Sequence, residues 1–159
     1  MNDPFRPADD AARTLSRELL AKARHGALAV LRDGAPFVTR IALTTDPRGL
    51  PLTLVSRLAV HTAPLLEATE VSLLLGEPGA RGDPLTHPRL TLQARPDPVL
   101  REDPGFDALA AHYVARRPKA KLYIGFGDFL LVRLRPLSGM LNGGFGKAYR
   151  LTPQDLGPA

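Results

Sequence analysis

The 159-residue sequence contains no cysteine and no tryptophan, and only 6% of its residues are aromatic. Without thiols the chain has no disulfides and no cysteine-based zinc or iron–sulfur site. Aromatic residues are also not interleaved with basic ones on any one predicted strand, which argues against base stacking and disfavours nucleic acid as a partner. Any chemistry must therefore come from other side chains or from a bound cofactor.

Long hydrophobic runs are also missing. No apolar stretch approaches the roughly 18–20 residues of a membrane span, and the first residues lack the basic-then-apolar pattern of a signal peptide. We therefore expect a cytoplasmic protein without membrane contact. With 44% hydrophobic residues, a chain of this size can bury one core. The expectation is a single domain over residues 1–159, with an ordered core at about 10–151.

The charge is moderately positive, with 21 Lys and Arg against 16 Asp and Glu, a net charge of +5. The basic residues are densest at 116–121, where a solvated edge is the more common outcome. A field of this size also attracts phosphorylated or carboxylated small molecules. A small-molecule substrate is the partner class that composition favours.

Hydrophobic periodicity predicts a mainly β protein with a few helices. Asp33-Gly34 is a strong two-residue hairpin signal, and the first three strands are expected to form an antiparallel meander. Asp103 is the expected cap of the second long helix, with Pro104 at its first position. The predicted order is a helix at 9–25, strands at 26–31, 37–44 and 52–55, a short helix at 62–68, strands at 71–75 and 89–95, a helix at 103–116, and strands at 129–134 and 137–141.

Short strands without βαβ alternation, and without G-x-G-x-x-G after a strand, argue against a Rossmann fold. A small β-barrel with peripheral helices fits better, because closure removes exposed strand edges. The fold class is therefore mainly β, within the α+β type.

The segment Leu54–Thr62 combines the end of a predicted strand with the start of a predicted helix. Free N–H groups at such a corner, together with the side chains of Ser56, Arg57, His61 and Thr62, suit an anionic group such as phosphate. Plain helix capping by Ser56 and a solvent-facing His61 remain the alternative.

Three further segments are unusual: Gly82–Leu92, Asp128–Leu134 and Gly143–Ala148. The planar guanidinium of Arg89 can bind a phosphate or carboxylate of a ligand. The alternative is an ion pair between Arg89 and Asp83 that holds the loop. Lys147 follows a glycine-rich turn that lacks P-loop spacing. No nucleophile beside a base and no paired carboxylates can be assembled, so no catalytic side chain and no side-chain metal site is assigned.

Taken in order, these segments resemble the successive signatures of the pyridoxamine 5′-phosphate oxidase-like FMN-binding split β-barrel family, in the branch that includes the haem-utilisation proteins. The resemblance covers about residues 12–151. It implies a six-stranded antiparallel split β-barrel with peripheral helices, acting as a homodimer with ligand clefts between the subunits.

The resemblance also implies an FMN-binding oxidoreductase, a flavoprotein whose cofactor carries the reaction. Its site residues would grip the phosphate at the corner, run along the isoalloxazine edge, or add cations near the cleft. The phosphate would be held by Ser56, Arg57, Leu58, His61 and Thr62. The isoalloxazine edge would lie along Val38, Thr39, Arg40 and Ile41, and the additional cations would be Arg89 and Lys147.

The sequence departs from its relatives at two places. Pyridoxamine oxidases have an Arg-Lys pair where this chain has His61-Thr62, which disfavours vitamin B6 oxidation. The C-terminal accessory domain of haem-utilisation relatives is not expected here, and no histidine follows His112. Haem ligation would need His25, His61, His87 or an open coordination site, which disfavours haem oxygenation. The alternative function is a haem- or tetrapyrrole-binding protein without flavin chemistry, and a dimer whose cleft has lost its ligand also stays open.

Overall fold

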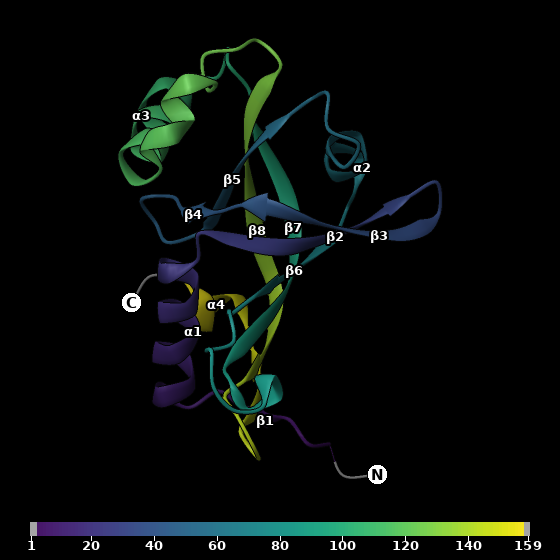
Figure 1. Cartoon of the computed structure of the whole chain (residues 1–159), viewed down its shortest axis with the longest axis vertical. Coiled ribbons are helices and arrows are strands. Elements are labelled where there is room, and N and C mark those ends of the chain that lie inside the picture. Colours follow the sequence, from purple (N-terminus) through teal and green to yellow (C-terminus); the bar gives the residue numbers. More distant parts are fainter. Residues whose placement is uncertain (1–2, 158–159) are drawn as a thin grey trace.

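The computed structural model describes residues 3–157, and within them nine strands form one sheet (Figure 1). The helices are α1 (Asp10–Lys22), α2 (Thr62–Glu67), α3 (Phe106–Arg116) and α4 (Pro153–Leu156), with 3-10 turns η1 (Pro84–Thr86) and η2 (Pro118–Leu122). The strands are β1 (Arg6–Pro7), β2 (His25–Arg32), β3 (Ala35–Ala42), β4 (Thr44–Thr45), β5 (Pro51–Ser56), β6 (Val71–Leu75), β7 (Arg89–Val99), β8 (Phe129–Asn142) and β9 (Ala148–Leu151).

The predicted first helix and hairpin are confirmed. The Asp9 carboxylate caps α1 by accepting from the Ala12 N–H at 2.7 Å, as expected for an N-cap acid. Asp33 and Gly34 turn the chain between β2 and β3 with φ of 52° and 77°. Positive φ at both central residues is what a type I′ hairpin requires.

The sheet order is β1-β9-β8-β7-β6-β2-β3, and the β2–β3 hairpin crosses the long strands β7 and β8 (Figure 1). The mainly β class is therefore confirmed. Over residues 3–157 the sheet is mixed, because β1 pairs with β9 in parallel while the other ladders are antiparallel. The six-stranded antiparallel description is not confirmed.

Beyond the β2–β3 hairpin, the predicted three-strand meander is confirmed only at its second turn, residues 46–49. β5 pairs antiparallel with the two-residue β4, Thr44 lying opposite Leu52, but it does not pair with β3. Its main partner is β8, with Leu54 opposite Leu131. The turn at Asp46 redirects the chain: its buried carboxylate accepts from the Arg48 and Leu50 N–H groups and from Arg133 Nε on β8 at 2.9 Å. β3 and β5 stay linked by one side chain, because the Thr53 hydroxyl donates to the Ala42 carbonyl at 2.7 Å.

The closing strands predicted at 129–134 and 137–141 are one continuous strand, β8. It pairs with β7 from Leu131 to Asn142, and the register shifts between Gln93 and Ala94, where β8 has one extra residue, Leu137, beside Pro136. A bulge tolerates the missing N–H of a proline, so the ladder continues past it. The unpredicted β9 then extends the sheet at the far end of β8.

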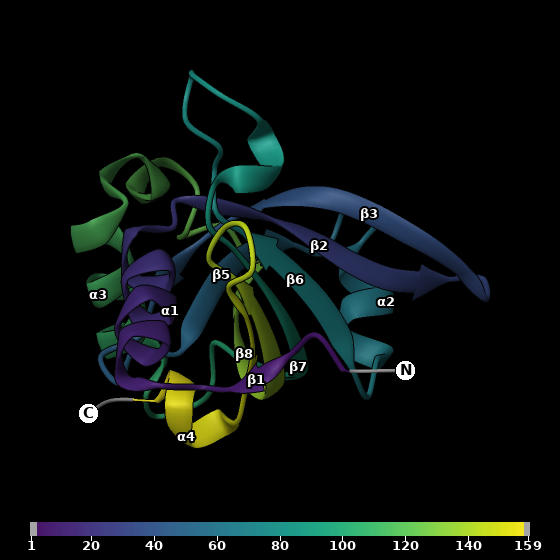
Figure 2. The ribbon, with the colours of Figure 1, turned by 90° about the horizontal axis from the view of Figure 1, so that it is seen from below.

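The cap predicted for the second long helix is also wrong. α3 begins at Phe106 after Gly105, while the Asp103 carboxylate accepts from the Leu100 N–H at 2.8 Å and closes the preceding turn. α3 and η2 cover the β5 end of β8 through a cluster of buried residues that includes Leu54, Leu109 and Leu131. The main core lies between the sheet, α1 and α2 (Figure 2).

Candidate functional site

The corner predicted to hold a ligand lies where buried β5 ends at Ser56 and α2 begins at Thr62. Leu65 anchors α2 in the main core with no exposed surface. The loop between them exposes apolar side chains, since Leu58 is 85% and Val60 57% exposed. The structure therefore brings together the five corner residues Ser56, Arg57, Leu58, His61 and Thr62.

The Ser56 hydroxyl is engaged on both sides. It donates to the carboxylate of Asp128 across 2.5 Å and accepts from the Leu58 N–H at 3.1 Å. Asp128 precedes β8, so this bond joins two segments far apart in the sequence. The Arg57 N–H donates to the Asp128 carbonyl at 2.8 Å, which fixes the same junction through the backbone.

Thr62 is turned inward. Its side chain is buried, the residue being 1% exposed, and its hydroxyl donates to the Ser56 carbonyl at 2.6 Å. Among backbone donors, the Ala59 N–H reaches the Ser56 carbonyl and the Thr62 N–H reaches the Ala59 carbonyl. Many of the donors that a corner can offer to a ligand therefore bind within the corner itself.

His61 is the N-cap of α2 and is half-buried. Within residues 3–157 its ring has no hydrogen-bond partner. Burial lowers the pKa of His61 below its ordinary value of 6.5, because a partly desolvated site disfavours the charged ring. At neutral pH the residue is therefore a neutral imidazole with a nitrogen lone pair to offer a ligand.

The other histidines have partners. His87 accepts from the Gly79 N–H at 3.2 Å through Nδ1, so Nε2 carries the proton and donates to the Arg81 carbonyl at 2.8 Å. His25 lies 3.3 Å from Glu77, and His112 contacts the Thr45 carbonyl at 2.7 Å. Of the haem ligands considered from the sequence, only His61 is without such a contact in the described part of the chain.

The remaining predicted residues lie elsewhere on the sheet. Val38 and Arg40 lie exposed on β3, Thr39 is half-buried and Ile41 is in the core. Arg89 begins β7 opposite Asn142 on β8, and Lys147 lies in the turn that follows. Ser56 pairs with Phe129 at the other end of β8. The 14-residue strand extends over roughly 40 Å at about 3.3 Å per residue, so these two cations lie far from the corner of their own chain.

The ion pair considered between Arg89 and Asp83 is not formed. Arg89 donates to the Leu85 carbonyl at 3.1 Å, and the Asp83 carboxylate accepts from the Leu85 N–H at 2.9 Å. Asp128 is the site residue that sequence reasoning missed. Its position just before a predicted strand was visible, but its contact with Ser56 depends on the unforeseen pairing of β5 with β8.

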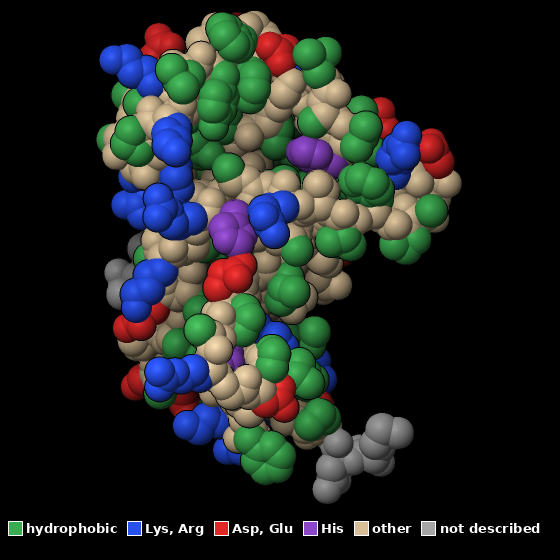
Figure 3. All heavy atoms as spheres, viewed as in Figure 1, with side chains coloured by type: hydrophobic (Ala, Val, Ile, Leu, Met, Phe, Trp, Pro, Cys, Tyr) green, Lys and Arg blue, Asp and Glu red, His purple; other side chains and the backbone are tan. Residues whose placement is uncertain are grey.

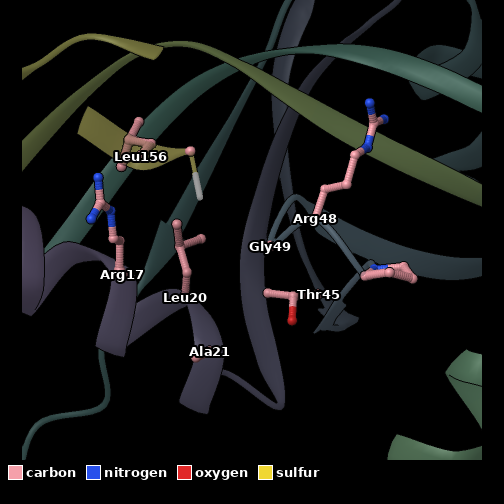
Figure 4. A pocket seen from close by; sticks show the side chains of 9 residues that line it. Arg17, Leu20, Ala21, Thr45, Arg48, Gly49 and Leu156 are labelled. Carbon is pink, nitrogen blue, oxygen red and sulfur yellow. The ribbon is translucent and has the colours of Figure 1, made fainter. Parts of the chain in front are cut away.

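Two pockets lie away from the corner. One of about 260 Å³ lies between α1, α4 and the turn after β4, with Arg17 and Arg48 on opposite sides of Leu20 (Figure 4). It contains none of the predicted site residues. The other, of about 510 Å³, lies on the outer sheet face beside Thr91, Gln93 and Met140. Among the described residues no helix is long and apolar enough to cross a membrane.

The comparisons with known proteins agree with the fold. No family model matches the chain. A chloroplastic non-canonical haem oxygenase of Arabidopsis thaliana is 34% identical over 104 residues, which are 65% of this chain and 30% of that protein. A protein of unknown function from Agrobacterium tumefaciens is 34% identical with a TM-score of 0.81, over 99% of this chain and 66% of its own.

A haem-binding protein of Mycobacterium smegmatis is 27% identical, also with a TM-score of 0.81, over 96% of this chain and 61% of its own. This chain thus spans less than a third of the Arabidopsis protein and under two thirds of the mycobacterial one. These likenesses agree with the resemblance of the chain to the haem-utilisation branch of the pyridoxamine 5′-phosphate oxidase-like split-barrel family.

Proposed function

We propose that this protein binds haem or a related tetrapyrrole at the strand-to-helix corner. The observation that carries the proposal is the chemistry left free there: a neutral His61 ring beside exposed apolar side chains, while the Ser56 and Thr62 hydroxyls bind within the protein. The haem-related names of the Arabidopsis and mycobacterial proteins support the same ligand class.

The residues of the corner fit such a ligand. A macrocycle needs apolar contacts, a nitrogen donor for the iron and cations for its propionates. Leu58 and Val60 supply exposed apolar surface, His61 the nitrogen, and the exposed Arg57 a cation. A bound haem would supply a redox-active iron, while these side chains bind and orient the macrocycle and shield one face from water.

Haem titration of the wild type and His61→Ala tests the proposal. We expect a saturable Soret band in the wild type and an affinity at least about tenfold lower in the variant, since a lost axial ligand removes a directional bond. His87→Gln is the matched control, because both nitrogens of that ring bind within its own loop. Equal Soret bands in wild type and His61→Ala would remove His61 from the site, and a flat wild-type titration would end the haem proposal.

FMN-dependent oxidoreduction is the second candidate. Its support is the family fold and the two groups of the corner that still face outward, Arg57 and the half-buried His61. Under this proposal the FMN ring carries the electrons and the protein fixes its orientation. A yellow protein that keeps its flavin through desalting would favour this candidate over haem binding.

We further propose that the protein is a homodimer and that its ligand clefts lie between the subunits. In-register residues on β3, β2, β6, β7, β8 and β9 form one row across the outer face of the sheet: Arg40, Ala27, Leu74, Thr91, Met140 and Arg150. Leu74 and Met140 are 45% and 44% exposed in the single chain. Exposed apolar residues in the middle of a sheet are typical of an interface.

The distance between the corner and Arg89 supports the same arrangement, since only a second subunit can bring Arg89 or Lys147 to the corner of the first. We expect a dimer by light scattering, and a monomer after Leu74→Arg, which places a charge in the middle of the row. Leu122→Arg is the control, because Leu122 is 79% exposed beside α3 and away from this face. A monomeric wild type would contradict the proposal.

A further inference from the structure

The corner between β5 and α2 has a carboxylate of its own. The Asp128 carboxylate accepts from the Ser56 hydroxyl at 2.5 Å, and in the described part of the chain no Lys, Arg or His forms an ion pair with Asp128. We propose that Asp128 is a specificity-determining residue that excludes phosphate-bearing ligands, FMN included, from this corner. The inference rests on the proposed function, since it concerns which ligand the same site accepts.

The first argument is the number of protons that can be donated. A serine hydroxyl has one hydrogen, and that of Ser56 already points to Asp128. The Ser56 oxygen accepts from the Leu58 N–H, and the Arg57 N–H binds the Asp128 carbonyl at 2.8 Å. A phosphate at this point would find acceptors where it needs donors.

The second argument is charge. A phosphate oxygen in contact with Ser56 Oγ would bring the phosphate to within about 5 Å of the Asp128 carboxylate, judged from ordinary hydrogen-bond lengths. Two anions so close repel each other strongly even at an effective dielectric constant of about 20. The facing cations are Arg57, which is exposed, and His61, whose lowered pKa keeps the ring neutral at pH 7.

The third argument is that the contact is built into the fold. Asp128 immediately precedes β8, and the Ser56–Phe129 pairing of β5 with β8 holds its side chain at the corner. Thr62 closes the other side through the Ser56 carbonyl. An apolar macrocycle with its propionates directed away from Asp128 meets no such obstacle.

FMN and riboflavin separate the effect of the phosphate from that of the ring, because they differ only in the phosphate. The experiment measures the dissociation constants of both flavins by fluorescence quenching for the wild type, Asp128→Asn and Ser56→Ala. Asp128→Asn removes the charge and keeps the shape, whereas Ser56→Ala removes the hydroxyl and keeps the charge. We expect Asp128→Asn to improve FMN binding relative to riboflavin by about tenfold or more, and Ser56→Ala to leave that ratio unchanged.

An unchanged ratio in Asp128→Asn, an equal gain for riboflavin, or no flavin binding by any variant up to millimolar concentration would overturn the proposal. If Asp128→Asn fails to fold, wild-type salt dependence replaces it: screening should improve FMN relative to riboflavin as ionic strength rises, and a flat ratio would overturn the proposal. Haem titration of the same samples is read separately, so a failure of haem binding is distinguished from a failure of phosphate exclusion.

Discussion

Replacing Thr62 by valine distinguishes a hydroxyl that serves the fold from one that serves a ligand. The residue is 1% exposed and donates to the Ser56 carbonyl at 2.6 Å. Valine keeps the branched shape, so the change removes one hydrogen bond, worth about 1 kcal/mol net. The carbonyl keeps its bond from the Ala59 N–H at 3.1 Å, which avoids the larger penalty of an orphaned acceptor.

We therefore expect Thr62→Val to lower the free energy of unfolding by about 1 kcal/mol, and Tm by roughly 2–4 °C for a chain of this size. Urea and thermal unfolding followed by circular dichroism measure both quantities. Thr69→Val is the control: Thr69 is exposed, so its stability should stay within about 0.5 kcal/mol of the wild type. Unchanged stability in Thr62→Val, together with weakened ligand binding, would refute the internal role of this hydroxyl.

Three further predictions concern the fold and its pH dependence. Gly76→Ala should lower the free energy of unfolding by about 3 kcal/mol or more, because φ is 102° and the added Cβ would meet the Pro88 carbonyl and lie 2.9 Å from the Arg89 Cα. Gly34→Ala is the control: its φ is also positive but its Cβ meets no atom, so it should lose only about 1 kcal/mol. Equilibrium unfolding measures both variants. Burial raises the pKa of Tyr113 from 10 to about 12. Between these two values the unfolded chain loses the phenol proton while the folded chain keeps it, so the free energy of unfolding should be unchanged below pH 10 and fall from pH 10 to 12. Urea unfolding of Tyr113→Phe should not show this loss. Because the pKa of His61 is lowered below 6.5, the haem affinity lost in His61→Ala should decline on acidification with a midpoint below pH 6.5; a midpoint at or above pH 6.5 would contradict this.

The elements that the sequence predicts well are those set by neighbouring residues. Asp9 starts α1, Asp33-Gly34 shapes the hairpin, and the strand predicted at Val71–Leu75 matches β6 residue for residue. These features depend on capping, turn geometry and side-chain periodicity within a few residues. The strand and helix flanking the corner were predicted for the same reason.

Features that depend on distant contacts were not predicted. The pairing of β5 with β8 joins Ser56 to Phe129, and no local pattern distinguishes it from a meander. The Asp46 carboxylate stabilises the β5–β8 pairing by accepting a hydrogen bond from Arg133 on β8. The position of Asp128 follows from this pairing, so the carboxylate in the corner could not be found before the fold was known. From the sequence, we expected the hydroxyls of Ser56 and Thr62 to donate to a ligand. In the fold they donate instead to the Asp128 carboxylate and the Ser56 carbonyl, and neither contact can be read from the local sequence.

The central claim is that the corner receives a tetrapyrrole rather than a flavin phosphate. The most direct measurement is the absorbance of the purified wild-type protein from 300 to 700 nm, with haem and FMN titrated in separate cuvettes and each sample then desalted. The account predicts a Soret band that saturates and survives desalting, and no retained flavin. A retained flavin spectrum without a stable Soret band would contradict it.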